Sequence, residues 1–279
     1  MFRKLYIYVL WKLISFIAIL RMYKIWDFPN GLCLVNLKRN TQILATLVAQ
    51  RLAVVHRGKP AELKDNLLTD PFLKFHANYS LTHVELNTPG TVSLANDLNS
   101  ILDLKDKKIL CLGARNLDEI FQLRLNGAKK SNITAVDLYS YIPEILPMDF
   151  HDLKFPKNSF DIVFYTGSFC YSHAPIKALR EAVRVLKPNG YIAIGDAFGV
   201  GGATSVTYRS KYSKYVKMQS RVKDALNEIT SSKTLLTQYF PNIQAVEKLF
   251  DNFKCTVILR RTYAWESKKT AHFNIITKF

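Results

Sequence analysis

Cysteine is scarce in this chain and is not arranged for crosslinking or metal binding. Only four of the 279 residues are cysteines, at positions 33, 111, 170 and 255, and no CxxC pair occurs among them. Structural zinc sites and the disulfide frameworks of small secreted proteins both need cysteines at short, regular spacings. The sequence therefore speaks against both, and we expect no metal and a reducing, cytoplasmic setting.

Negative charge is also in short supply. The chain has 22 Asp and Glu against 39 Lys and Arg, which gives a formal net charge of +17. Such a balance favours an anionic neighbour, for example nucleic acid, an anionic membrane surface or an acidic substrate. The basic residues are scattered along the chain, which is equally typical of a solvated surface. Charge alone selects none of these partners and does not exclude nucleic acid.

The apolar run at the amino terminus is too short to predict an ordinary membrane span. It covers residues 5–20 with a lysine inside it, whereas a spanning helix needs about twenty apolar residues. No small residues follow it, so a cleavable signal is not expected. At helical spacing one narrow polar stripe appears, made of Lys4, Tyr8, Lys12 and Ser15. We expect residues 1–30 to form a helix that lies in a membrane interface, acts as a short anchor, or packs on the protein's own core.

The remainder of the chain divides into a weakly patterned region and a clear α/β domain. Residues 31–106 predict a helical cap or a region that shapes a substrate pocket, and residues 107–279 predict the main domain. Apolar runs at 109–112, 133–136, 160–166 and 190–196 alternate with helical segments at 117–125 and 175–186, the second closed by Gly190. This alternation predicts a Rossmann-like, doubly wound sheet of mostly parallel strands. Runs at 255–265 and 271–279 predict an antiparallel C-terminal hairpin at its edge.

Glycine is missing where a dinucleotide site would need it. The stretch "KILCLGARNLDEIFQL" has one glycine, Gly113, in the turn after the first strand, but the dinucleotide fingerprint uses three. Asn116 is a candidate cap for the next helix, and Asp118 and Glu119 lie in its first turn. These acids would repel a pyrophosphate at the helix N-terminus. A nicotinamide-dependent reductase is therefore disfavoured, whereas a nucleoside without phosphates, such as S-adenosylmethionine, meets no such repulsion.

Two acidic residues lie where strands of this pattern end. Asp137 comes twenty-four residues after Gly113, at a place where a carboxylate can accept hydrogen bonds from ribose hydroxyls. Asp149 follows at the next strand end, where it could accept from an adenine amino group while the backbone N–H of Phe150 donates to a ring nitrogen. Ligands of open parallel sheets lie beyond the carboxyl ends of the strands. The spacing therefore predicts an adenosine derivative across these strand ends.

Longer stretches carry a resemblance to a known superfamily. The segments "ILCLGARNLDEI", "ITAVDLY" and "MDFHDLKFPKNSFDIVFYTGSFCYSHAPIKALREAVRVLKPNGYIAIGD" resemble class I S-adenosylmethionine-dependent methyltransferases. In particular, "LKFPKNSFDIV" and "ALREAVRVLKPNG" are close to the pattern LPFPDxSFD…V…LxEhxRVLKPGG common among them. The resemblance covers roughly residues 108–196, and the terminal hairpin fits the antiparallel final strands of that fold. It implies S-adenosylmethionine as the cofactor.

The resemblance also implies which residues line the cofactor. They are Gly113, Ala114 and Arg115 at the methionine end, Asp137 and Leu138 at the ribose, Asp149 and Phe150 at the adenine, and Thr166 and Gly167 as the floor beneath the sulfonium. The first motif departs from the usual pattern, with Cys111 in place of an acidic residue and with Arg115 and Leu117 where glycines often lie. Two explanations stay open, a branch with a "GAR" turn or a pocket that has lost its cofactor. The short gap between Asp137 and Asp149 predicts a turn where relatives have a helix.

The expected reaction is transfer of a methyl group to an oxygen or nitrogen of a small-molecule, glycan or lipid-linked acceptor. Holding nucleophile and methyl in line supplies much of the rate of such a displacement, so a base is optional. His173 is the best-placed candidate base, with helix capping or local packing as its alternative role; His151 is expected to be structural. A catalytically inactive binding module and a nucleic-acid methyltransferase remain alternatives, although the fourth strand ends in "YTGS" and not in an "NPPY"-like tetrapeptide. Nothing in the sequence identifies the acceptor.

Overall fold

The computed structural model describes residues 48, 61–62, 89–114, 116–199, 243–264 and 270–279. By contacts the chain divides into two compact units, Met1–Lys59 and Pro60–Phe279, and every described strand belongs to the second. The predicted membrane-interface helix at 1–30 and most of the predicted cap at 31–106 lie outside the described residues. The predicted division at 30 and 106 therefore stays a prediction.

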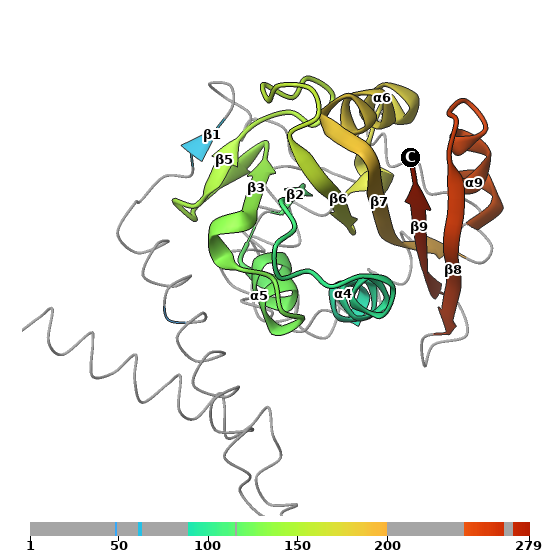
Figure 1. Cartoon of the computed structure of the whole chain (residues 1–279), viewed down its shortest axis with the longest axis horizontal. Coiled ribbons are helices and arrows are strands. Elements are labelled where there is room, and N and C mark those ends of the chain that lie inside the picture. Colours follow the sequence, from blue (N-terminus) through green and yellow to red (C-terminus); the bar gives the residue numbers. More distant parts are fainter. Residues whose placement is uncertain (1–47, 49–60, 63–88, 115, 200–242, 265–269) are drawn as a thin grey trace, which may run out of the picture. The chain divides into compact units, whose positions relative to one another are not determined.

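A seven-stranded sheet forms the centre of the second unit (Figure 1), in the order β5-β3-β2-β6-β7-β9-β8. Its strands are β2 (Ile109–Leu112), β3 (Ile133–Asp137), β5 (Ile145–Pro147), β6 (Phe160–Thr166), β7 (Leu186–Gly199), β8 (Thr256–Ala264) and β9 (Thr270–Lys278). The first five are parallel, and β9 runs antiparallel to both of its neighbours. The predicted α/β sheet with a C-terminal hairpin is thereby confirmed. Within the hairpin, β9 enters the sheet and β8 forms its edge.

Two short strands lie beside this sheet. β1 (Ala61–Glu62) pairs antiparallel with β4 (Tyr139–Ser140), which follows directly after β3. Residues 138–148 contain β4 and β5 and no helix, as the short gap between Asp137 and Asp149 predicted. The loop predicted to contact the adenine therefore begins close to the end of β3.

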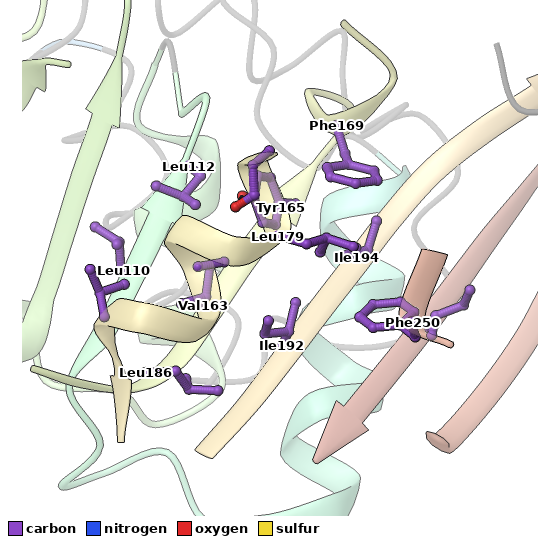
Figure 2. Close-up of a cluster of buried hydrophobic side chains, with 14 of the residues drawn as sticks. Leu110, Leu112, Val163, Tyr165, Phe169, Leu179, Leu186, Ile192, Ile194 and Phe250 are labelled. Carbon is purple, nitrogen blue, oxygen red and sulfur yellow. Dashed lines mark hydrogen bonds between the residues drawn. The ribbon is translucent and has the colours of Figure 1, made fainter. Parts of the chain in front are cut away.

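Helices cover both faces of the sheet. Leu179 of α6 (Pro175–Val185) and Phe250 of α9 (Ile243–Phe250) join a buried cluster with alternate strand residues such as Ile192 (Figure 2). α4 (Pro89–Ile101) lies on the opposite face, where its Leu94 approaches Gly195 of β7. α5 (Asp118–Leu125) packs beside α4. β2 is buried at every residue and β6 at nearly every residue, as strands covered on both faces require.

The end of α6 differs from the expectation that Gly190 closes it. The helix ends at Val185, and Leu186 is already extended with φ −77° and ψ 139°. The left-handed residue of this turn is Asn189, with φ 63°, a conformation that asparagine tolerates better than most side chains. Gly190 is needed for space instead, because a Cβ there would lie 2.6 Å from Cγ of Leu186.

A buried polar network joins α4 to the C-terminal hairpin. The carboxylate of Asp97 is almost fully buried and accepts hydrogen bonds from Asn274 Nδ2 at 2.8 Å and from the Tyr263 hydroxyl at 2.7 Å. Arg261 also donates to it from the edge strand, and Asn274 donates to Ser93 Oγ at 3.1 Å. A buried carboxylate is stable only when it is paired and hydrogen-bonded, and these partners meet that need.

His272 of β9 is buried on the same side of the sheet. Its ring packs so closely on Gly90 that a Cβ at that glycine would collide with it. Within the described part of the chain, Nε2 of His272 has no hydrogen-bond partner. Burial lowers the pKa of His272 to about 4, because the charged ring is poorly solvated there. The imidazole is therefore neutral at pH 7 and acts as a packing group.

None of the helices in the described ranges is long and apolar enough to cross a membrane.

Candidate functional site

The turn after β2 lies tightly against two neighbouring strands. Gly113 has φ +75°, and its backbone N–H and that of Ala114 donate to the Val136 carbonyl at 2.9 and 3.1 Å. A Cβ at Gly113 would collide with the side chain of Ser168. Glycine is thus required here both by the left-handed backbone and by the close approach of the β6 loop. Arg115, the third residue predicted at the methionine end, lies outside the described residues.

The helix that follows keeps its acidic first turn. α5 begins at Asp118, whose backbone N–H donates to Asn116 Oδ1 at 2.9 Å. The N-cap residue is Leu117, and Asn116 lies one residue before it. Asn116 still accepts the hydrogen bond from the first backbone N–H of the helix. Asp118 is buried and accepts from Gln122 Nε2 at 3.3 Å. Because the positive end of the helix dipole already faces Asp118 and Glu119, a phosphate would gain little there.

Asp137 and Leu138 lie at the carboxyl end of β3, as predicted. Asp137 is 6% exposed, and its Oδ1 accepts a hydrogen bond from the backbone N–H of Tyr139 at 3.3 Å. Leu138 is half-buried. Its strand lies beside β2, so this carboxylate and the Gly113 turn occupy neighbouring strand ends.

The next strand end carries the predicted adenine loop. Asp149 lies two residues beyond β5, and its side chain is 34% exposed. Its Oδ1 accepts from the backbone N–H of His151 at 2.8 Å and contacts Nδ1 of the same residue at 2.7 Å. The hydrogen bond with His151 lowers the pKa of the Asp149 carboxyl, so the group is an ionised acceptor at neutral pH. The Phe150 ring packs on the Tyr165 ring in an edge contact, 5.7 Å between centroids and at an interplanar angle of 80°.

Thr166 and Gly167 end β6 as predicted for the floor of the site. Gly167 has φ +58° and is exposed, and its N–H donates to the Gly195 carbonyl at 2.8 Å. The Thr166 hydroxyl is buried and has no hydrogen-bond partner among the residues described. An unpaired buried hydroxyl at a strand end is a position that a polar ligand group can satisfy.

The loop after β6 ties the strand ends together. Ser168 Oγ donates to the Leu112 carbonyl at 2.7 Å, and the Cys170 N–H donates to Asp196 Oδ2 at 2.9 Å. Ser172, which is fully buried, contacts His151 Nε2 with Oγ at 2.7 Å. The loop is therefore fastened to the ends of β2, β5 and β7. Local sequence patterns do not reveal these ties, since the partners are 56, 26 and 21 residues apart.

His173, the candidate base, lies at the surface of the same loop. It is exposed, and its ring centroid is 4.1 Å from that of His151 at an interplanar angle of 40°. An exposed imidazole beside the strand ends is accessible to an acceptor. Its catalytic role stays a prediction.

The cysteines near these strand ends do not provide thiolates. Cys111 and Cys170 are both buried, and burial raises the pKa of each thiol well above its ordinary value. In the ranges that the structure describes, no three His, Cys, Asp or Glu side chains come close enough together to hold a metal ion. The groups available here are carboxylates, hydroxyls, imidazoles and backbone N–H groups.

Those groups fit the adenosine derivative that the sequence predicts. Carboxylates at successive strand ends suit the donors of a ribose and an adenine. The buried Thr166 hydroxyl has no partner among the described residues. The individual contacts of the nine proposed cofactor residues stay predictions.

Comparison with known proteins identifies a methyltransferase domain. The family model described as "Methyltransferase domain" matches residues 119–194, from the first turn of α5 to β7. The glycine/sarcosine/dimethylglycine N-methyltransferase of Actinopolyspora halophila is 30% identical over 88 residues, which are 32% of this chain. The chain spans only 14% of that relative's length.

Solved structures of similar fold have low sequence identity to the chain. A SAM-dependent methyltransferase from Aquifex aeolicus is 15% identical, with 74% of this chain and 98% of that chain covered and a TM-score of 0.44. An S-adenosylmethionine-dependent methyltransferase from Mesorhizobium loti is 11% identical, with 66% and 96% covered and a TM-score of 0.47. The family match from α5 to β7, on a parallel sheet that ends in an antiparallel pair, carries the assignment. Residues 119–194 therefore match a methyltransferase domain, which supports the predicted resemblance to class I S-adenosylmethionine-dependent methyltransferases, with S-adenosylmethionine as the cofactor.

Proposed function

We propose that the protein transfers a methyl group from S-adenosylmethionine to an oxygen or nitrogen of a small-molecule, glycan or lipid-linked acceptor. The observation that carries this proposal is the placement of Asp137 and Asp149 at successive strand ends beside the Gly113 turn. The two carboxylates can accept hydrogen bonds from the ribose and the adenine of an adenosine derivative. A pyrophosphate would not be favoured beside them.

An amine nitrogen is the acceptor to test first. The relative from Actinopolyspora halophila is named for N-methylation of glycine, sarcosine and dimethylglycine. The bound cofactor supplies an activated methyl group. Transfer to an amine nitrogen would release S-adenosylhomocysteine and a proton, and a base such as His173 would accept that proton.

The residues of this chain act by binding and alignment. Asp137 and Asp149 orient the nucleoside, and Gly167 and the Thr166 hydroxyl form a floor that limits where an acceptor can lie. Such positioning supplies most of the rate in an in-line transfer. Exposed His173 is placed to take the proton that the acceptor loses.

Calorimetry with S-adenosylmethionine and S-adenosylhomocysteine tests the proposal. Asp137→Ala should weaken S-adenosylhomocysteine at least tenfold, about 1.4 kcal/mol, and Asp137→Asn should weaken it less because an acceptor oxygen for the Tyr139 N–H remains. Asp152→Ala is the matched control, since Asp152 pairs with Lys154 at the exposed side of a neighbouring loop.

Two results would contradict the proposal. The first is unchanged affinity in Asp137→Ala, which would remove the ribose contact. The second is absence of any binding by the wild type, which would favour the inactive binding module. Incubation with labelled cofactor and glycine, sarcosine or a nucleic acid then separates small-molecule from nucleic-acid acceptors.

A further inference from the structure

His151 is buried between two loops of the site and bonds to both. Its side chain is 6% exposed. On one side Nδ1 lies 2.7 Å from Asp149 Oδ1, and on the other Nε2 lies 2.7 Å from Ser172 Oγ. The ring therefore bridges the loop after β5 to the loop after β6. Sequence reasoning assigned His151 a structural role only, because Ser172 is 21 residues away.

The hydrogen bonds of this bridge run in one direction. Ala174 donates its backbone N–H to Ser172 Oγ at 3.3 Å. The buried Ser172 hydroxyl then donates to Nε2 of His151, and Nδ1–H donates to Asp149. With this tautomer each donor has one acceptor, and no polar atom of Ser172 is left unpaired. In the opposite tautomer Nε2–H would donate to Ser172 Oγ, but the lone pair of Nδ1 would face Asp149 Oδ1, so that two acceptors would oppose each other and Asp149 would lose its side-chain donor.

The bridge leaves one oxygen of Asp149 unused. The backbone N–H and the Nδ1–H of His151 both bond to Oδ1, and no described residue donates to Oδ2. The Asp149 side chain is 34% exposed, so a ligand can reach that oxygen. Because His151 holds the carboxylate ionised, Oδ2 can only accept a hydrogen bond.

We propose that His151 is a positioning residue that fixes Asp149 so that Oδ2 selects a ligand with an amino group at this place, an adenine and not a hypoxanthine. This inference rests on the proposed function. Hypoxanthine presents a carbonyl oxygen where adenine presents its amino group, and two acceptors facing each other repel. The proposal makes base selection a property of the Asp149–His151–Ser172 bridge, and not of Asp149 alone.

Competition between two nucleosides measures this selection directly. We expect the wild type to bind S-adenosylhomocysteine at least tenfold more tightly than S-inosylhomocysteine. His151→Gln places its amide near the Nε2 position, so it retains the Ser172 contact and loses the Asp149 bond; the ratio should fall below threefold. His151→Asn places an amide nitrogen near the Nδ1 position and is the matched variant that should keep most of the ratio. Asp149→Asn should favour the inosine compound relative to wild type, because its amide can donate to a carbonyl.

A measurement on the unliganded wild type tests the proposed hydrogen-bond bridge even if a variant folds poorly. Nitrogen-15 imidazole spectra of the unliganded wild type should show His151 protonated on Nδ1 and unprotonated on Nε2 at neutral pH. The opposite tautomer would overturn the proposal without any variant.

The outcomes separate this inference from the proposed function. If the wild type binds neither nucleoside, the proposed function fails and the inference fails with it. If the wild type binds both equally, or if His151→Gln weakens both equally and keeps the ratio, only the inference fails and His151 is merely structural.

Discussion

His151 and His272 are both almost excluded from solvent, yet their surroundings differ. At the strand ends, both ring nitrogens of His151 are bonded, and the acceptor beyond it, Asp149, has an oxygen left for a ligand. Under α4, the His272 ring rests on Gly90, its Nε2 has no partner among the residues that the structure describes, and burial holds its pKa at about 4. Burial of a histidine therefore does not mark a functional site. A better indication of a functional site is a buried histidine whose hydrogen-bond partner, like Asp149, still has an oxygen that can accept a hydrogen bond from a ligand.

Removal of the buried Asp97 carboxylate under α4 should have the largest effect on stability. Asp97→Ala leaves Asn274 and Tyr263 without their acceptor and should lower the free energy of unfolding by about 3–5 kcal/mol. Urea denaturation measures this change. Asp106→Asn, which removes an exposed pair with Lys129, is the control and should leave the midpoint unchanged. Affinity for S-adenosylhomocysteine should stay within twofold in any Asp97 variant that folds, and a larger loss would show that the two regions are coupled.

The pH dependence of stability sharpens the comparison next. His272 has a pKa of about 4 in the folded chain, against 6.5 for an ordinary histidine. Below pH 6.5 the unfolded state binds the extra proton, so the stability of the folded state falls as pH drops toward 4. From pH 7 to pH 5 the loss from this group should be about 2 kcal/mol. The slope should largely vanish in His272→Phe, and an equal slope in both proteins would assign it to other groups.

A pair of glycine substitutions gives the smallest expected effect and the most direct contrast. Gly113→Ala forces a side chain into a left-handed conformation against Ser168 and should cost about 1–2 kcal/mol of stability. It should also weaken S-adenosylhomocysteine at least threefold, because the turn faces the predicted methionine end. Gly90→Ala crowds the His272 ring and should reduce the thermal midpoint without changing that affinity. Equal effects of both substitutions on affinity would erase the distinction between the two regions.

Local signals predicted most of the sheet. β2 and β6 begin and end where their apolar runs do, at Ile109–Leu112 and Phe160–Thr166, because both strands are buried on both faces and read as continuous apolar sequence. The strand-end position of Asp137 followed from the same alternation, whereas the short strand β5 before Asp149 was not among the predicted apolar runs. Helix α6 was predicted with an error of one residue at its end, where Leu186 turns extended before the glycine.

The contacts that the sequence did not predict are those between residues far apart in the chain. Asp97 meets Asn274 across 177 residues, and Ser168 meets Leu112 across 56. No periodicity encodes such pairs, since each depends on how the strands are ordered in the sheet. The role of His151 was missed for the same reason: its bond to Asp149 is local, but the bond that sets its tautomer comes from the next loop.

The three fastenings of the β6 loop, to Leu112, Asp196 and His151, have a consequence for how the site comes into being. A folding intermediate that has paired β2 with β3 but has not yet added β6 and β7 lacks the anchors that shape the crevice. Nucleoside capture should therefore switch on late and all at once during refolding, which would make a bound nucleoside a reporter of the finished sheet.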